Sequence, residues 1–298
     1  MTPTKDRLGR FGVWIMPMTL LHTPVDTQRE QFARIERLGY GSVWTGEPPA
    51  ASPASGREIF TQLALMLAAT ERLVAGAGVA NIRMRDPQAT HSGAATLAEA
   101  YPDRVILGLG GHGGERPLAE LRAHLDAMDE AATRIQPDAR YPRVLAALGP
   151  KAHRLAGERA GGVHPFLQPV EHTRAARDAL GPGPLLIPHQ AVVLDADAGR
   201  ARGRIRALFH MGGRENHYTA NYRRLGYGDA DLGGEPSDRL VDAVVAWGDD
   251  AAIAARARGQ LAAGADHVLL HPLVDDLTSA VDDLARLAPL LTGRSAAS

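Results

Sequence analysis

Eight short apolar runs alternate with helix-like segments along this chain of 298 residues, and that alternation limits the fold most strongly. The runs are Phe11–Met16, Ser42–Thr45, Leu73–Val79, Val105–Leu109, Val144–Leu148, Gly162–Phe166, Gln190–Leu194 and His267–His271. Strands that alternate with helices form parallel sheets, because each helix returns the chain to the start of the next strand. Eight such units close into a barrel of about 250 residues. We therefore predict an α/β protein with a (β/α)8 TIM barrel, folded as a single domain over residues 1–298.

The stretch after the seventh run is longer than one crossover helix requires. Residues 195–240 contain two helix-like segments, Ala198–Met211 and Asn216–Leu225. We interpret this stretch as a helical excursion from the barrel that folds over its mouth as a wall or lid.

Composition and charge exclude several classes of function. The chain has no cysteine, which excludes thiolate catalysis, disulfides and cysteine-ligated metal centres. No H-E-x-x-H spacing is present, and we expect no metal site. The formal net charge is −1 with both signs interspersed, so we expect no nucleic-acid partner. No apolar stretch approaches the ~20 residues of a membrane span and Met1–Arg10 is polar, so we expect a cytoplasmic protein with no membrane association.

Residues capable of acid–base chemistry lie at the ends of several runs. Glu47 follows the second run, His112 follows the fourth, and His164 and His271 lie in the sixth and eighth. In a β/α barrel the C-terminal strand ends meet on one face, where the active site forms. We name Glu47 and His112 as candidate catalytic residues, because carboxylates and imidazoles can exchange protons near neutral pH. A solvated loop glutamate and a purely structural histidine remain open as alternatives.

Other histidines are expected to lie away from this face. His189 precedes the seventh run, which predicts a place on the opposite, stabilising face of the barrel. His91, His124, His153 and His172 fall in helix-like segments.

Two glycine-rich segments indicate places where a ligand meets bare backbone. Gly108–Gly113 matches G-x-G-x-x-G between a predicted strand and a predicted helix. A Rossmann dehydrogenase using NAD(P) would place this motif first in its domain, with an acidic residue after the next strand, and this chain does neither. We interpret the glycines as a floor for a flat ring or a phosphate. Gly76–Asn81 indicates a bulge or a close ligand. A flexible turn and tight small-residue packing remain open.

A third segment, Gly149-Pro150-Lys151, ends the fifth run and begins a helix-like stretch. The free N–H groups at a helix N-terminus can hold an anion, and Lys151 would add positive charge. An ordinary helix start with proline in its first turn remains open.

Taken in order, these segments resemble the bacterial luciferase-like superfamily, and within it the probable F420-dependent oxidoreductases. The resemblance rests on Gly39–Trp44, Gly78–Ile82 with Arg85–Pro87, Leu107–Gly110, Ala147–Lys151, Gly162–Pro165, and Ser237–Asp242 through Gly264–Val268. Each segment is modest alone, but their order and spacing along almost the whole chain make the resemblance specific.

The resemblance implies a TIM-type barrel that binds coenzyme F420, or alternatively FMN, at the C-terminal strand ends, usually as a homodimer. It also implies a non-prolyl cis peptide at Gly78–Val79 that supports the ring. Together with the glycine-rich segments and the helix start described above, it leads us to assign cofactor binding to Gly78, Val79, Ala80, Asn81, Gly110, Gly111, Gly149, Pro150, Lys151, His164 and Pro165.

On this basis we predict an oxidoreductase that transfers a hydride between F420 and a small organic substrate. An FMN-dependent luciferase-like monooxygenase and a noncatalytic flavin-binding protein are the alternatives. The chain departs from some deazaflavin dehydrogenases, because Glu47 is followed by Pro48-Pro49 and the fourth loop offers His112 in place of a glutamate. Their sugar-phosphate chemistry is therefore not carried over.

Overall fold

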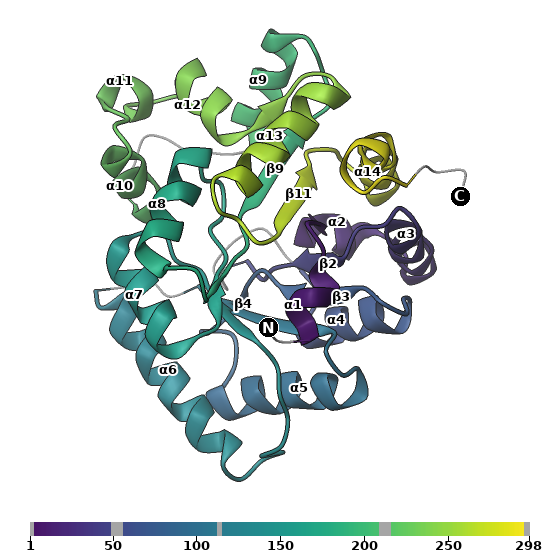
Figure 1. Cartoon of the computed structure of the whole chain (residues 1–298), viewed down its shortest axis with the longest axis vertical. Coiled ribbons are helices and arrows are strands. Elements are labelled where there is room, and N and C mark those ends of the chain that lie inside the picture. The colour runs from purple at the N-terminus through teal and green to yellow at the C-terminus, as the bar shows by residue number, and fades with distance from the viewer. Residues whose placement is uncertain (1–2, 49–55, 112–114, 209–215, 295–298) are drawn as a thin grey trace.

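The computed structural model describes residues 3–48, 56–111, 115–208 and 216–294 of the chain (Figure 1). Its strands are β1 (Phe11–Trp14), β2 (Ser42–Thr45), β3 (Val74–Ala77), β4 (Ala80–Asn81), β5 (Val105–Gly110), β6 (Arg143–Leu145), β7 (Gly162–Val163), β8 (Leu185–Leu186), β9 (His189–Val193), β10 (Ala246–Trp247) and β11 (Val268–Pro272). They follow the order β10-β9-β11-β1-β2-β3-β5-β6-β7-β8, with β4 beside β5. All of these pairings are parallel.

Residues 185–193 close the barrel, because they pair with strands from both sides of the sheet. β8 pairs with β7, and β9 pairs with β11. Between β8 and β9, Ile187 N donates to Val163 O at 3.0 Å, and Leu269 N donates to Pro188 O at 3.0 Å. The predicted TIM barrel is therefore confirmed. The seventh run begins earlier than expected and is interrupted at Pro188, which has no N–H to donate to a neighbouring strand.

Helices cover the outside of the barrel and join successive strands (Figure 1). They are α1 (Pro3–Leu8), α2 (Pro17–His22), α3 (Val25–Arg37), α4 (Ile59–Ala68), α5 (Pro87–Ala100), α6 (Pro117–Ala132), α7 (Pro150–Arg159), α8 (Val170–Leu180), α9 (Ala198–Leu208), α10 (His217–Arg224), α11 (Asp229–Leu232), α12 (Asp238–Val244), α13 (Asp250–Ala262) and α14 (Leu277–Leu291). Successive side chains of a strand point to opposite faces. Accordingly Val13, Val43 and Leu107 belong to the main core with the helices, whereas Trp14 and Trp44 belong to a separate cluster inside the barrel.

The short helix α1 covers the N-terminal ends of the strands. Leu8, at its end, is buried in the same cluster as Trp44 and Val74. A Cβ added to Gly41, which directly precedes β2, would lie 1.8 Å from Leu8 O. This close approach of α1 leaves the opposite rim, at the C-terminal strand ends, for a functional site.

The excursion after the seventh strand forms helices α9 to α12, which gather at the upper end of the molecule in Figure 1. The two predicted helices are present as α9 and α10, and the expected end of the first, Met211, lies outside the described residues. Tyr222 Oη donates to Leu167 O at 2.6 Å, and Asn221 Nδ2 donates to Gln168 Oε1 at 2.7 Å. Because the loop containing Leu167 and Gln168 follows β7, α10 packs against the C-terminal rim of the barrel.

Gly157 offers a simple test of the assignment of α7. It lies exposed in the C-terminal half of α7, and a Cβ added there meets no atom within 4 Å. Replacing it with alanine is expected to raise the free energy of unfolding by about 0.5–1 kcal/mol, because glycine is the less favourable residue in a helix interior. Urea denaturation would measure the change, and a decrease in stability would contradict the open surroundings described for Gly157.

Candidate active site

The C-terminal rim brings together predicted site residues that are far apart in the sequence. Asn81 in β4 pairs with Gly110 at the end of β5. Gly111 has a φ of +75°, and a Cβ added to it would lie 2.3 Å from Asn81 Cγ. A Cβ added to Gly78 would lie 3.1 Å from His164 Nε2. The predicted convergence of Asn81 and His164 is therefore present, while His112 lies outside the described residues.

The segment between β3 and β4 is held from both sides at this rim. The Gly78–Val79 peptide bond is cis, as the family resemblance predicted. Gly78 N donates to Thr45 O at 2.7 Å, and Gly78 O accepts a hydrogen bond of 3.0 Å from Trp14 Nε1. Val79 O accepts one of 2.9 Å from Glu47 N. We call residues 78–81 the rim bulge.

Two glycines in β5 make room for the rim bulge. A Cβ added to Gly108 would lie 2.0 Å from Ala77 O, and one added to Gly110 would lie 2.7 Å from Val79 Cγ2. The backbone of β5 can therefore approach β3 and the side chain of Val79 only because these positions have no side chain. The remaining bulge residue, Ala80, pairs with Leu109.

Glu47 contacts the rim bulge, and its side chain is almost completely buried among its partners. Its side chain is 5% exposed and forms an ion pair with Arg85, of which 13% is exposed. The carboxylate also accepts hydrogen bonds from Asn81 N at 2.9 Å and Ile59 N at 3.3 Å. The sequence interpretation had not assigned Arg85 to the site. The available signal was its place in the loop after the third strand, just before the helix start at Asp86-Pro87.

His164 presents one unpartnered nitrogen beside the rim bulge. Its side chain is buried, and Nδ1–H donates to Ile187 O at 2.7 Å. Nε2 is buried without a hydrogen-bond partner in the part of the chain that the structure describes. Burial lowers the pKa of His164 to about 4, although the bond to Ile187 acts in the opposite direction. The imidazole is therefore neutral at pH 7, with Nε2 as an acceptor. A buried acceptor without a partner is a place where a ligand N–H can bind.

The prediction that His189 lies on the opposite face is wrong. His189 begins β9, and its Nε2 lies 2.9 Å from His271 Nδ1 inside the barrel. The ring centroids of Phe166 and His189 lie 3.9 Å apart, and those of Trp14 and His271 lie 4.6 Å apart. The error arose because the seventh barrel strand begins at Leu185, in β8, and not at Gln190. His189 therefore lies inside this strand and not before its start.

These interior histidines are neutral. Burial lowers the pKa of His271 to about 3, and burial together with His271 and His164 lowers the pKa of His189. Their shared hydrogen bond has one imidazole as donor and the other as acceptor. The two imidazoles are therefore both neutral, and their rings pack together inside the barrel.

A second part of the rim is the start of α7. Its N-cap is Gly149, which has no side chain to cap the helix, and Pro150 occupies the first turn, followed by the exposed Lys151. Arg224, in α10, lies against this position, because a Cβ added to Gly149 would be 3.1 Å from Arg224 Nη1. Arg224 Nη1 also donates to Asn221 Oδ1 at 3.2 Å. This places positive charge where helix N–H groups already favour an anion.

Arg224 was missed by the sequence interpretation. It lies about 75 positions after Gly149 in the chain, on a helix whose docking side no local pattern specifies. Pro165, the last predicted cofactor residue, accepts a hydrogen bond of 3.0 Å from His189 N through its carbonyl.

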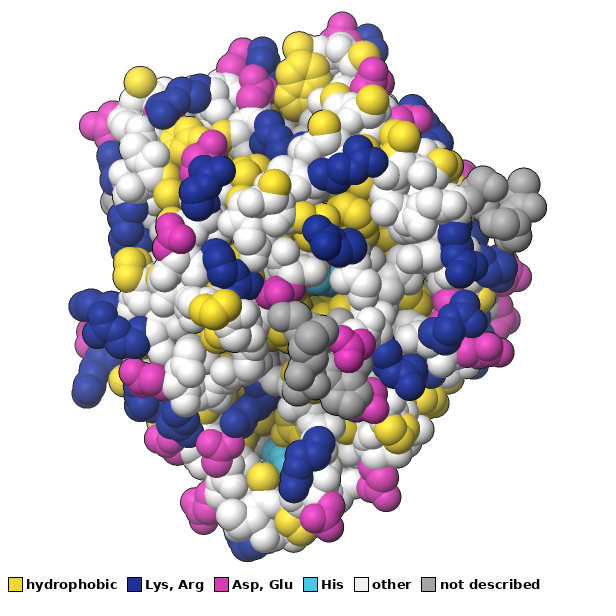
Figure 2. Space-filling view, viewed as in Figure 1, with side chains coloured by type: hydrophobic (Ala, Val, Ile, Leu, Met, Phe, Trp, Pro, Cys, Tyr) yellow, Lys and Arg dark blue, Asp and Glu magenta, His cyan; other side chains and the backbone are white. Residues whose placement is uncertain are grey.

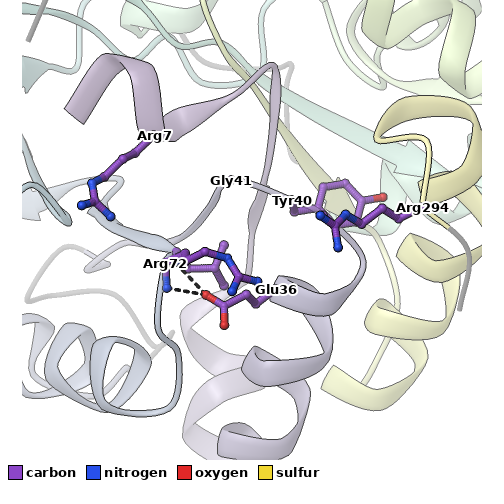
Figure 3. Close-up of a pocket in the computed structure, with 8 residues that line it drawn as sticks. Arg7, Glu36, Tyr40, Gly41, Arg72 and Arg294 are labelled. Carbon is purple, nitrogen blue, oxygen red and sulfur yellow. Dashed lines mark hydrogen bonds between the residues drawn. The ribbon is translucent and has the colours of Figure 1, made fainter. Parts of the chain in front are cut away.

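Two other hollows lie away from the rim bulge. One, of about 270 Å³, is lined by Arg7, Glu36, Gly39, Tyr40, Gly41, Arg72, Leu73 and Arg294 (Figure 3). Gly41 and Leu73 directly precede β2 and β3, so this hollow lies at the N-terminal end of the barrel. There the Glu36 carboxylate accepts N–H bonds from Arg72 at 2.6 Å and from Leu73 at 2.9 Å, which lowers the pKa of Glu36 against the effect of burial. We assign this end to stability.

The second hollow, of about 640 Å³, lies between α9 and the ends of β9 and β11, where Asp195, Arg200, Arg204 and Asp275 line it. Arg200 pairs with Asp195 at 2.8 Å, and Arg204 pairs with Asp275 at 3.2 Å. These four charged groups are thus matched with one another, and the fifth in the lining, Asp283, pairs with Arg286 at 4.0 Å.

On the face shown in Figure 2, acidic and basic side chains are interspersed. Within the described ranges, no three His, Asp or Glu side chains come together as metal ligands. In the same ranges, none of the helices has the length and apolar character needed to span a membrane.

A family model described as luciferase-like monooxygenase matches residues 8–131, which run from β1 through the rim bulge and β5 to α6. The resemblance to the luciferase-like superfamily is confirmed. The matched part of the chain contains Glu47, the rim bulge, Arg85 and Gly110.

Solved structures share the barrel fold over nearly the whole chain. An F420-dependent secondary alcohol dehydrogenase in complex with an F420–acetone adduct is 17% identical, with a TM-score of 0.68 over 95% of this chain and 99% of that one. The F420-dependent tetrahydromethanopterin reductase from Methanopyrus kandleri is 17% identical, with a TM-score of 0.71 over 94% and 99%. The oxygenating constituent of 3,6-diketocamphane monooxygenase from Pseudomonas putida, in complex with FMN, is 13% identical, with a TM-score of 0.71 over 98% of both chains. At these identities the likeness shows the fold.

Proposed function

We propose that this protein is an oxidoreductase that binds coenzyme F420 at the C-terminal rim and transfers a hydride between F420 and a small organic substrate. One observation carries the proposal: the rim bulge, the bare backbone of Gly110 and the start of α7 lie on one rim of a luciferase-like barrel. The F420-dependent enzymes among the similar structures support this choice of cofactor.

The residues of the rim fit a flat, anionic cofactor. The rim bulge would support the ring. Gly110 and Gly111, whose missing side chains make room for Val79 and Asn81, would hold the bulge in place beneath it. His164 Nε2 would accept a hydrogen bond from an N–H of the ring, because it has no partner among the described residues. The start of α7 with Lys151 and Arg224 would hold a phosphate.

The chemistry is divided between the cofactor and the chain. When bound, the deazaflavin ring would supply the hydride-accepting or hydride-donating carbon. The chain would orient the ring, and α10, which packs against the rim, would exclude water from it. We propose His112 as the residue that supplies protons. A homodimer and a cytoplasmic location remain predictions.

An FMN-dependent monooxygenase is the second candidate, because one of the similar structures is a monooxygenase in complex with FMN. Calorimetric titration of the purified protein with F420 and with FMN separates the two. We expect a Kd for F420 at least tenfold below that for FMN. Tighter binding of FMN, with substrate-dependent oxygen uptake by the reduced holoprotein, would favour the monooxygenase, and binding of neither would contradict both.

Arg224 tests the assignment of the phosphate to the start of α7. Arg224→Ala is expected to raise the Kd for F420 about fivefold to tenfold, which corresponds to roughly 1–1.4 kcal/mol for an exposed charge. The effect should shrink at high salt, since exposed charges are screened. Arg223→Ala on the same helix is the control, because Arg223 pairs with Asp229 at 2.8 Å. Equal Kd values for wild type and Arg224→Ala would remove Arg224 from the site.

A further inference from the structure

The carboxylate of Glu47 has all its acceptor positions occupied. Oε2 accepts from Arg85 Nη1 at 2.8 Å and from Asn81 N at 2.9 Å. Oε1 accepts from Arg85 Nη2 and from Ile59 N at 3.3 Å. A carboxylate offers about four such positions. A group with this set of donors cannot take up a proton from a substrate without first giving up one of these bonds.

Arg85 has further contacts besides Glu47. A second carboxylate, Glu58, lies 3.3 Å from Arg85 Nη2, and the ring of Phe60 lies 5.3 Å from the guanidinium carbon. Burial acts to lower the pKa of Arg85, but the bonds to Glu47 and the charge of Glu58 raise it above its ordinary value. Arg85 is therefore a permanent cation beside the Glu47 carboxylate. Glu58 in turn caps α4 through Phe60 N and Thr61 N.

The contacts of Glu47 join the end of β2 to the rim bulge at two points. Its backbone N–H donates to Val79 O at 2.9 Å, and its carboxylate receives Asn81 N–H. These two bonds flank Ala80, so the rim bulge is tied on either side of its centre. The bond to Ile59 N extends the connection to the start of α4, and Arg85 lies in the loop that leads to α5.

We propose that Glu47 and Arg85 form a positioning pair that fixes the rim bulge beneath the cofactor ring, and that Glu47 is not the proton-transfer group. This inference rests on the proposed function for the identity of the ring, but not for the position of the bulge. It replaces the acid–base role expected for Glu47 from the sequence.

The main test is Glu47→Gln, which keeps the size of the side chain and removes its charge. An amide has one acceptor oxygen, and its NH2 group would face donors of Arg85 or the backbone. In the cofactor-free protein, we expect hydrogen exchange at the Asn81 amide to accelerate at least tenfold. In binding titrations, we expect the Kd for F420 to rise at least tenfold. The pH profile of kcat/KM should keep the inflections of the wild type.

Two further variants make the test specific. Arg85→Lys keeps the charge but loses the two-pronged contact, so it should shift exchange and Kd in the same direction by about threefold. It also serves if Glu47→Gln does not fold. Glu120→Gln is the matched control. Glu120, in α6, pairs at 2.6 Å with Arg83, which lies two residues before Arg85, and 40% of the Glu120 side chain is exposed. It should reproduce the wild-type exchange and Kd.

The outcomes separate this proposal from the proposed function. If Glu47→Gln loses one inflection of the pH profile while the Asn81 exchange and the Kd stay at wild-type values, Glu47 is an acid–base residue and the proposal is overturned. If the wild type binds neither F420 nor FMN, the proposed function fails, but the exchange measurement still decides. Equal Asn81 exchange in wild type and Glu47→Gln would then overturn the positioning pair by itself.

Discussion

Gly108→Ala is expected to lower the free energy of unfolding by about 3 kcal/mol or more, a large share of the stability of an ordinary domain. The added Cβ would lie 2.0 Å from Ala77 O, which belongs to the backbone of the neighbouring strand. A flexible side chain could move aside, but a backbone carbonyl in the middle of a parallel sheet cannot do so without separating β3 from β5. Because the rim bulge directly follows Ala77, cofactor binding should weaken together with stability. Urea denaturation and F420 titration measure the two effects.

Gly183→Ala is the matched control for this prediction. Gly183 lies in the exposed turn before β8, and a Cβ added there meets nothing within 4 Å. Its free energy of unfolding should stay within about 0.5 kcal/mol of the wild type. A Gly108→Ala protein as stable as the Gly183→Ala protein would show that β3 and β5 are not packed as closely as the structure places them.

Lowering the pH from 7 to 4 is expected to remove roughly 3 kcal/mol of stability for each fully buried imidazole in the barrel. Burial lowers the pKa of His164 and of His267 to about 4 and that of His271 to about 3. An unfolded histidine titrates near 6.5. As the pH falls below 6.5, the unfolded state takes up protons that the folded state excludes until about pH 4. The stability that these groups contribute is therefore complete above pH 6.5 and is lost through this window.

The slope of stability against pH provides the measurement. Urea denaturation at a series of pH values between 7.5 and 4 should show stability falling steadily below pH 6.5. His267→Gln should reduce the slope by about one proton, since it removes one group that titrates only in the unfolded state. His22→Gln should leave the slope unchanged, because His22 is exposed on α2. Stability that stays constant between pH 7 and 5 would contradict the neutral, buried state of these histidines.

Much of the rim could be predicted because it depends on local pattern. The alternation of apolar runs and helices gave the barrel, and barrel geometry then placed Asn81, Gly110 and His164 at one end. The cis peptide at Gly78–Val79 followed from the resemblance of that segment to a family, and not from its local propensity. The assignment of His189 failed, because strand limits depend on pairing with neighbours: the chain from Leu185 to Val193 pairs with β7 and then with β11.

The partners of charged side chains were beyond local pattern. Glu47 and Arg85 are 38 positions apart, and each had several other partners of opposite charge along the chain. Only the packing of the loops after β2 and β4 brings them into one buried ion pair. The approach of Arg224 to Gly149 likewise depends on how α10 docks against the loop after β7.

The amino-acid sequence by itself determined the alternation of strands and helices, the glycines that permit close backbone approach and the polar residues at strand ends. These properties are short-range, since they follow from side-chain periodicity and backbone freedom within a few residues. The tertiary structure decided which acceptor each buried charge meets, which imidazoles lose their contact with water and which helix closes over the start of α7. Those outcomes depend on desolvation and on distances between segments far apart in the chain, and these are set only when the barrel closes.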